Sequence, residues 1–285
     1  MEISIDDVAA NGMTFRVRSA GPVTGRAVIL LHGFPQTSQS FANQLIALGE
    51  AGYRAIAPDQ RGYSPGARPA EVTAYRISEL VSDVVALADA VGIESFDLVG
   101  HDWGGLVAWA TAGAHPDRVR THNPVSTPHP NALAAALEAG DPDQTKRSAY
   151  LDLLAQVDVA ERFFLGEDGS GSGLRGVFSH SGIDSATTDV YVECLSEPGA
   201  LTAALNWYRA NDLHSPMEVG PITMPTLYVW STDDMALGRV AAEATAAFAL
   251  GPYRFEVLEG VTHWIPDVEP ERLSALLLGH LGDYG

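Results

Sequence analysis

The chain has 285 residues, of which 46% are hydrophobic, so it is long enough for one sizeable core with or without a smaller inserted domain. The 36 acidic and 17 basic residues give a formal net charge of −19, which would repel nucleic-acid phosphates and anionic membrane surfaces. We therefore expect no nucleic-acid partner and no membrane partner, and we interpret the acidic residues as a solvated surface.

The sequence carries few signals for a special compartment or a bound group. Residues 1–7 are acidic and alternate like a strand, unlike a secretory signal peptide, and no apolar run reaches the roughly eighteen residues that span a bilayer. Cys194 is the only cysteine, which rules out an internal disulfide. No His and Cys residues have metal-ligand spacing and no glycine-rich phosphate loop is present, so we expect no metal and no cofactor. These features predict a soluble cytoplasmic protein and do not indicate an oligomeric state.

Apolar runs typical of buried strands alternate with helical patterns along much of the chain. This alternation indicates a parallel sheet that helices cover on both faces. Two earlier alternating stretches, Ile3–Val8 and Met13–Val17, predict an antiparallel hairpin at the sheet edge. The runs that predict the other strands are Ala27–Leu31, Tyr53–Ala57, Phe96–Val99, Thr226–Trp230 and Tyr253–Leu258.

A helical segment interrupts this alternation. The strand pattern breaks after Pro124–Pro130 and returns only at Pro221, and Thr202–Arg209 between them has clear helical periodicity. Asp141 followed by proline is a good helix cap and first-turn pair. We therefore expect an α/β fold: a mostly parallel central sheet with helices on both faces and an inserted helical cap. The predicted division is a core of residues 1–127 and 216–285 with a cap at residues 128–215.

The strand Ala27–Leu31 leads into a tight turn, His32-Gly33-Phe34-Pro35. A Gly-Pro turn after a strand can direct a backbone N–H, here that of Phe34, into the space above the sheet, where it can help to form an oxyanion hole. On their own these four residues are more typical of an ordinary loop.

An acidic residue stands at the apex of a predicted strand-to-helix turn, Val99-Gly100-His101-Asp102-Trp103-Gly104-Gly105. Such a turn needs small residues two positions before and after its apex, and Gly100 and Gly104 meet that demand. A carboxylate that attacks an sp³ carbon forms an alkyl ester, which water can still cleave, whereas a serine would form an inert ether. Asp102 therefore favours epoxide opening or halide displacement, with the Trp103 N–H as a second oxyanion donor. By itself, the motif is equally typical of a glycine-rich loop with an aspartate helix cap.

Two later strands end in residues that complete this chemistry. Asp233 and Asp234 follow Thr226–Trp230, and His263 follows the next strand. A nucleophile, an acid and a histidine, each just past the end of a strand, occur here in the order of a catalytic triad at the carboxyl edge of a sheet. We predict that Asp234 holds the Nδ1–H of His263 and leaves Nε2 free to take a proton from water. Asp233 is the alternative orienting group, and we interpret the other eight histidines as structural.

Taken together, these motifs resemble the epoxide hydrolases of the α/β-hydrolase fold over essentially the whole chain. The HGFP turn, the GHDWGG turn, the loop Asp59–Ser64 and the late aspartate and histidine all fit that family's pattern. Ser64 replaces a usual glycine and Met235 a usual proline, and neither change removes a reactive group. The resemblance implies that the substrates are a small-molecule epoxide and water, and that the product is a vicinal diol formed through an ester on Asp102.

The same resemblance implies two cap tyrosines that donate hydrogen bonds to the epoxide oxygen. Tyr208 lies in Leu205–Arg209, which resembles one of the two family segments, and Tyr150 takes the corresponding position in the other. The Pro-Gly usually found after the first tyrosine is absent, with Gln156–Asp158 in its place, which weakens the alignment that selects Tyr150. An aromatic residue on the apolar face of a cap helix would give the same pattern.

Other functions fit parts of this pattern. A haloalkane dehalogenase uses the same Asp-His-Asp set, but it typically has Asn or Glu where Phe34 stands, and halide leaves without needing a proton. A fluoroacetate-type dehalogenase is expected to carry arginine at the position of Trp103. A non-catalytic ligand-binding protein of the same fold would keep the pocket and lose the hydrolysis of the ester.

Overall fold

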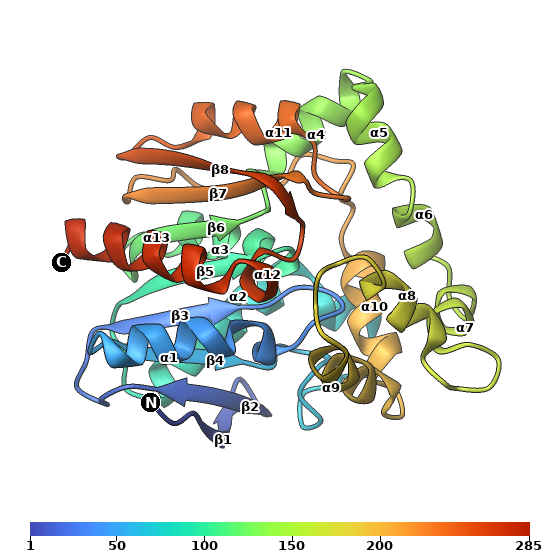
Figure 1. Cartoon of the computed structure of the whole chain (residues 1–285), viewed down its shortest axis with the longest axis horizontal. Helices are drawn as coiled ribbons and strands as arrows, with labels where there is room; N and C mark the ends of the chain where they lie inside the picture. The colour runs from blue at the N-terminus through green and yellow to red at the C-terminus, as the bar shows by residue number, and fades with distance from the viewer.

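One eight-stranded sheet organises the chain, and the computed structural model describes all 285 residues (Figure 1). The strand order is β1-β2-β4-β3-β5-β6-β7-β8, with β1 and β2 as an antiparallel hairpin at one edge and β3 to β8 parallel. The predicted edge hairpin and mostly parallel sheet are therefore confirmed. The strands are β1 Ser4–Ala10, β2 Met13–Ala20, β3 Ala27–Leu31, β4 Arg54–Pro58, β5 Phe96–His101, β6 Val119–Val125, β7 Thr226–Asp233 and β8 Tyr253–Thr262.

Helices cover both faces of the sheet because its central strands bury side chains on both sides. In β3, Val28 and Leu30 pack into one apolar cluster, and Ile29 and Leu31 pack into another, as strand side chains that alternate between faces must do. Helices α1 and α13 cover the Val28 side, in front of the sheet in Figure 1, and α2 and α3 cover the Ile29 side behind it. The core helices are α1 Ala42–Glu50, α2 Ile77–Ala90, α3 Trp103–Ala114, α11 Arg239–Ala244, α12 Ile265–Val268 and α13 Pro270–Asp283, with short 3₁₀ turns at Ser38–Phe41, Val72–Tyr75 and Thr245–Phe248.

Strand β6 is absent from the strands that the apolar runs predict. Its inner residues are polar although they are buried, so they give no apolar signal. The polar groups bond to the neighbouring strand β5: Thr121 Oγ1 donates to Asp97 Oδ1 at 2.9 Å, and Asn123 Nδ2 donates to the Leu98 carbonyl at 3.1 Å. Hydrogen bonds from the Thr121 and Asn123 side chains to β5 thus satisfy these buried polar groups.

Seven helices lie between β6 and β7 and stand beyond the carboxyl ends of the strands, on the right in Figure 1. The helix cap predicted at Asp141 is present, because its side chain accepts a hydrogen bond from the Gln144 N–H at 2.7 Å. The predicted helix Thr202–Arg209 lies within α10. The inserted helices are α4 Pro130–Glu138, α5 Pro142–Ser148, α6 Leu151–Leu154, α7 Val159–Leu165, α8 Ser172–Phe178, α9 Ser185–Ser196 and α10 Ala200–Ala210.

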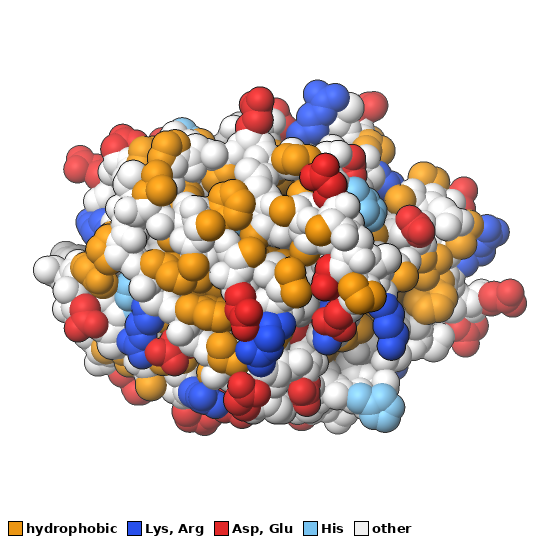
Figure 2. Space-filling view, turned by 90° about the horizontal axis from the view of Figure 1, so that it is seen from above, with side chains coloured by type: hydrophobic (Ala, Val, Ile, Leu, Met, Phe, Trp, Pro, Cys, Tyr) orange, Lys and Arg blue, Asp and Glu red, His pale blue; other side chains and the backbone are white.

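Charged groups are dispersed over the surface that Figure 2 shows from above. Acidic side chains stand among basic and apolar ones on that face and do not merge into one patch. Among the helices, none combines the length and the apolar character that crossing a bilayer requires.

Three polar side chains join the inserted helix α9 to two segments of the core. The Tyr191 hydroxyl of α9 donates to the Asp267 carboxylate of α12 and lies 2.9 and 3.0 Å from its two oxygens. Gln36, just after the Phe34-Pro35 turn, donates its side-chain amide to Asp267 Oδ2 at 2.5 Å. Burial raises the pKa of Asp267 to about 7 against these two donors, and the charge of Asp184 adds to the rise. This joint between α9 and the core, formed by Gln36, Tyr191 and Asp267, therefore changes charge near neutral pH.

We predict that Asp267→Asn stabilises the protein at pH 8 and leaves its stability nearly unchanged at pH 4. A carboxyl group whose folded pKa is raised contributes stability that is lost as the pH rises from its unfolded pKa of about 4 through the folded value. Asparagine keeps an acceptor for the Tyr191 hydroxyl and has no charge to bury. The gain at pH 8 should therefore be roughly 1–4 kcal/mol in the free energy of unfolding, measured by urea denaturation. An equal effect at both pH values would contradict the prediction.

Candidate functional site

The turn between β5 and α3 holds Asp102 in a strained backbone conformation, with φ 52° and ψ −121°. Close backbone contacts on both sides make this turn possible. A Cβ added to Gly104 would lie 2.0 Å from the Leu31 carbonyl oxygen, and one added to Gly100 would lie 2.2 Å from the Gly104 carbonyl oxygen. The small residues that the sequence predicts around the apex are therefore required by packing, and they bring the Asp102 side chain to the carboxyl edge of the sheet.

His263 lies between two carboxylates that come from different strand ends. Its Nδ1 is 2.7 Å from Asp234 Oδ2, and its Nε2 is 3.6 Å from Asp102 Oδ2. Asp234 and His263 are buried. Asp233, the alternative orienting carboxylate, is exposed to solvent, and the structure records no contact between it and His263. The structure thus brings together Asp102, Asp234 and His263 and leaves Asp233 outside the group.

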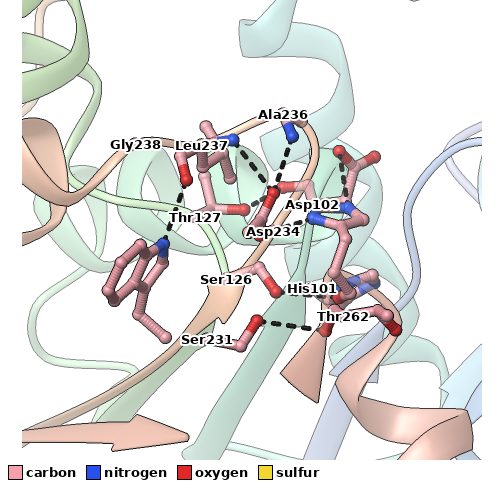
Figure 3. Close-up of polar contacts among 12 residues, drawn as sticks. His101, Asp102, Ser126, Thr127, Ser231, Asp234, Ala236, Leu237, Gly238 and Thr262 are labelled. Atoms are coloured by element: carbon pink, nitrogen blue, oxygen red, sulfur yellow. Dashed lines mark hydrogen bonds and ion pairs between the residues drawn. The ribbon is translucent and has the colours of Figure 1, made fainter. Parts of the chain in front are cut away.

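The loop after β7 fixes the orientation of Asp234. Its Oδ1 accepts the backbone N–H groups of Ala236 and Leu237 at 2.8 and 2.9 Å, as Figure 3 shows. Its Oδ2 is therefore left to face His263. The Trp230 indole donates to the Leu237 carbonyl at 3.2 Å, which ties the end of the loop back to β7. The carboxylate is thus positioned by backbone groups rather than by flexible side chains.

A second histidine, His101, supports the loop that carries His263. The sequence predicts only a structural role for it. The His263 carbonyl accepts hydrogen bonds from His101 Nε2 at 2.9 Å and from the Ser126 hydroxyl at 3.0 Å (Figure 3). Burial and, to a smaller extent, the charge of His263 lower the pKa of His101 to about 4. His101 is therefore neutral at physiological pH, with its proton on Nε2. Its position directly before Asp102 is the only sequence signal for this role.

The charges at this centre stabilise one another although burial opposes all of them. Burial alone would lower the pKa of His263, but the charges and hydrogen bonds of Asp234 and Asp102 raise it to about 10. Burial likewise disfavours the charged form of Asp102, but the hydrogen bond and charge of His263 hold the pKa of that carboxyl below its usual range. At neutral pH the site therefore contains an imidazolium between two carboxylates.

Two backbone N–H groups face the Asp102 carboxylate, as the sequence predicts. The Phe34 N–H donates to Asp102 Oδ1 at 2.8 Å. The Trp103 N–H contributes as a further donor that lowers the pKa of Asp102. Because Oδ1 is held in this way, Oδ2 is the oxygen left to face His263 and the open space of the site.

A cavity of about 190 Å³ opens between this edge of the sheet and the inserted helices; we call it the front cavity. Five of the predicted site residues line it: Phe34, Asp102, Tyr150, Tyr208 and His263. Most of its other walls are apolar, and several of them carry no signal in the sequence, namely Leu153, Leu154, Phe163, Phe164 and Val177. Asp102 and His263 are the only charged side chains in its lining.

Both predicted tyrosines face this cavity but are held differently. The Tyr208 ring on α10 packs edge-on against Trp103 and Phe34, with ring centroids 5.0 and 5.5 Å apart. Tyr150, at the start of α6, is 38% exposed. The pKa values of both hydroxyls lie above the ordinary tyrosine value because the protein encloses them and the Asp102 charge is near. The structure records no residue that accepts a hydrogen bond from either hydroxyl, so both protons are available.

Trp207, next to Tyr208 on α10, does not line the front cavity. It is buried, and its indole donates to the Arg61 carbonyl at 2.9 Å, which docks α10 on the core. The structure contains no cluster of three or more His, Cys, Asp or Glu side chains in an arrangement that could hold a metal ion.

Comparisons with known proteins agree with this geometry. The sequence profile of the α/β hydrolase fold family matches residues 26–270. An AB hydrolase superfamily protein of Bacillus subtilis is 34% identical over 277 residues, which cover 96% of each chain. Epoxide hydrolase A of Mycobacterium tuberculosis is 31% identical over an alignment of 308 residues that also covers 96% of each chain. The chain belongs to the epoxide hydrolases of the α/β hydrolase fold.

Solved structures of this family have the same architecture. An epoxide hydrolase from metagenomes of hot environments superposes on the chain with a TM-score of 0.88 and 29% identity, over 99% of both chains. The family and the fold class predicted from the sequence are therefore confirmed.

We predict that Asp102→Asn lowers the pKa of His263 by about one to three units, because it removes one of the two negative charges that hold the imidazolium. Titration of the His263 ring by NMR with labelled histidine measures this. Asp233→Asn is the matched control: it removes an exposed carboxylate at the end of β7, next to Asp234, and should leave the pKa of His263 unchanged. A His263 pKa that stays near 10 in Asp102→Asn would mean that Asp102 does not interact with the ring.

Proposed function

We propose that the chain hydrolyses an epoxide with water to a vicinal diol, through an ester formed on Asp102. The observation that carries the proposal is that one apolar cavity is lined by an ionised carboxylate, a histidine and two tyrosine hydroxyls with free protons. The relatives named as epoxide hydrolases support the same activity. In this proposal the inserted helices α4–α10 act as a cap that carries the tyrosines.

In the first step Asp102 Oδ2 attacks one ring carbon of the epoxide. A bond forms between Oδ2 and that carbon, and the bond from the same carbon to the ring oxygen breaks. The ring oxygen takes a proton from Tyr150 or Tyr208, because an alkoxide is too basic to leave without one. The low pKa of Asp102 keeps the nucleophile ionised at neutral pH. The result is a hydroxyalkyl ester and a tyrosinate.

Formation of the ester changes the role of His263. The ester carries no negative charge, so one of the two groups that raise the pKa of His263 is lost. The imidazolium then gives its proton to the tyrosinate, whose own pKa is raised by its surroundings. His263 becomes neutral, held at Nδ1 by Asp234, with Nε2 able to accept a proton. The contact with Asp234 thus stabilises the imidazolium before alkylation and orients the neutral His263 as a base afterwards.

In the second step His263 takes a proton from water, and the hydroxide attacks the carbonyl carbon of the ester. Negative charge develops on Oδ1, which already accepts the Phe34 N–H in the resting site, and the Trp103 N–H is a further donor to this carboxyl group. The bond from the carbonyl carbon to Oδ2 then breaks. His263 gives its proton to Oδ2 as this bond breaks and then takes the second proton of the water from the new carboxylic acid. The diol leaves with Oδ2, the oxygen from water stays on Asp102, and the site returns to its ion pair.

We predict that His263→Gln accumulates the ester, because it removes the base for the second step and keeps the nucleophile. After mixing with styrene oxide, intact-protein mass spectrometry should show the mass of one whole epoxide added. Asp102→Ala is the matched control; it should show no adduct and lose several orders of magnitude in turnover. In single turnover of the wild-type protein in heavy-oxygen water, the label should appear in Asp102. A folded, inactive His263→Gln protein that forms no adduct would remove His263 from this role.

We predict that Tyr150→Phe and Tyr208→Phe each slow single-turnover ring opening, because each removes one proton donor and keeps the ring that shapes the cavity. Either hydroxyl alone should support partial alkylation. The double variant should lose roughly 10²- to 10⁴-fold, the usual range for general acid assistance. Breakdown of an ester already formed should change much less. A double variant that opens epoxides at the wild-type rate would exclude both tyrosines, and fast halide release from a haloalkane would then favour a dehalogenase.

A further inference from the structure

A second, much smaller cavity adjoins the front cavity; we call it the rear cavity. The two share Asp102, Tyr150, Tyr208 and Ala236, so the nucleophile and both tyrosines form the boundary between them. The front cavity has a volume of about 190 Å³, whereas the rear cavity has about 30 Å³. A volume of 30 Å³ admits about two water-sized groups, whereas a benzene molecule fits a cavity of about 150 Å³. The space on the two sides of the reacting groups is therefore strongly unequal.

Apolar side chains close the rear cavity. Leu106, Leu133 and Leu237 line it, and all three are buried in the core. Leu151 and Leu213 line it as well, and both are only partly buried. These two leucines also line an open groove of about 510 Å³ on the outer side, so they stand between the rear cavity and that groove. Tyr208 lines both spaces as well, so the rear cavity is separated from the groove by Tyr208 and these two leucines.

Because of the geometry of ring opening, this difference in volume between the two cavities selects among substrates. An epoxide opened by Asp102, with its oxygen on Tyr150 or Tyr208, lies on the line from the carboxylate to the hydroxyls. Substituents on its two carbons diverge to opposite sides of that line. One set therefore enters the front cavity and the other enters the rear cavity.

We propose that the substrates are epoxides substituted on one side: one ring carbon carries an apolar aryl or alkyl group, and the other carries only hydrogen or a methyl group. The inference rests on the proposed function. The front cavity holds the apolar group against aromatic and aliphatic side chains, among them Phe163, Phe164 and Val177. Leu151 and Leu213 are specificity-determining residues, because they limit the space on the other side.

The test compares styrene oxide, trans-β-methylstyrene oxide and trans-stilbene oxide in the wild-type protein and three variants. The wild-type kcat/KM should be similar for the first two epoxides and roughly 100-fold or more lower for trans-stilbene oxide, whose second phenyl group has no space. Leu213→Ala and Leu151→Ala open the rear cavity to the outer groove and should each reduce the ratio of the styrene oxide kcat/KM to the trans-stilbene oxide kcat/KM about tenfold or more. Leu153→Ala is the matched control, because Leu153 lines only the front cavity; it should leave the ratio as it is.

Each outcome decides the inference or the function on which it rests. Wild-type kcat/KM values for styrene oxide and trans-stilbene oxide within tenfold of each other would overturn the one-sided substrate class. So would an unchanged ratio in both Leu213→Ala and Leu151→Ala, provided that thermal unfolding shows both proteins folded and styrene oxide is still hydrolysed. If the wild-type protein hydrolyses none of the three epoxides, the proposed function itself fails, which is a different result from a changed ratio.

Discussion

The contact between the Asp102 turn and β3 is the constraint on which the rest of the site depends. Gly104 lies so close to the Leu31 carbonyl that a Cβ would come within 2.0 Å of it. Leu31 directly precedes the turn that carries Phe34, whose N–H is 2.8 Å from Asp102 Oδ1. The same contact thus sets the strained backbone of Asp102 and its distance to a donor. A larger residue at position 104 would separate the two strand ends, and with them the carboxylate and the N–H.

The inserted helices are docked on the loops that hold the charged residues. Gln144 of α5 donates to the Ala236 carbonyl at 2.9 Å and accepts the Gly238 N–H at 2.8 Å, in the loop that surrounds Asp234. Tyr191 of α9 bonds to Asp267, four residues after His263. The hydrogen bonds that place the helices over the cavity therefore also restrain the loops of the acid and the histidine. A change that loosens these helices will disturb the site even when it touches no reacting group.

Local patterns explain what the sequence could predict, and long-range contacts explain what it could not. The hairpin, the parallel strands and the glycines around Asp102 depend on short apolar or glycine patterns, so they were predicted correctly. Strand β6 was missed because its buried residues are polar and bond across to β5. The choice between Asp233 and Asp234 stayed open because neighbouring residues look alike in sequence, whereas in the fold one is exposed and the other buried. The joint of Gln36, Tyr191 and Asp267 has no local signal, since its hydrogen bonds span 231 and 76 residues.

The two tyrosines differ in how firmly the core holds them, and this difference follows from the helices that carry them. Tyr208 stands on α10, next to Trp207, whose indole bonds to the core at Arg61. Tyr150 begins α6, whose side chains make no hydrogen bond to the sheet core. The next helix, α7, is tied to α10, because Arg209 pairs with Glu161 at 2.9 Å. The position of Tyr150 relative to the core therefore depends indirectly on α10. Its side chain is 38% exposed, in keeping with this looser support. The firmly held donor packs against Trp103 and Phe34, the two residues whose N–H groups face Asp102. In the proposed mechanism, one proton donor and the two oxyanion donors therefore belong to a single packed unit, whereas the other proton donor, Tyr150, stands outside it.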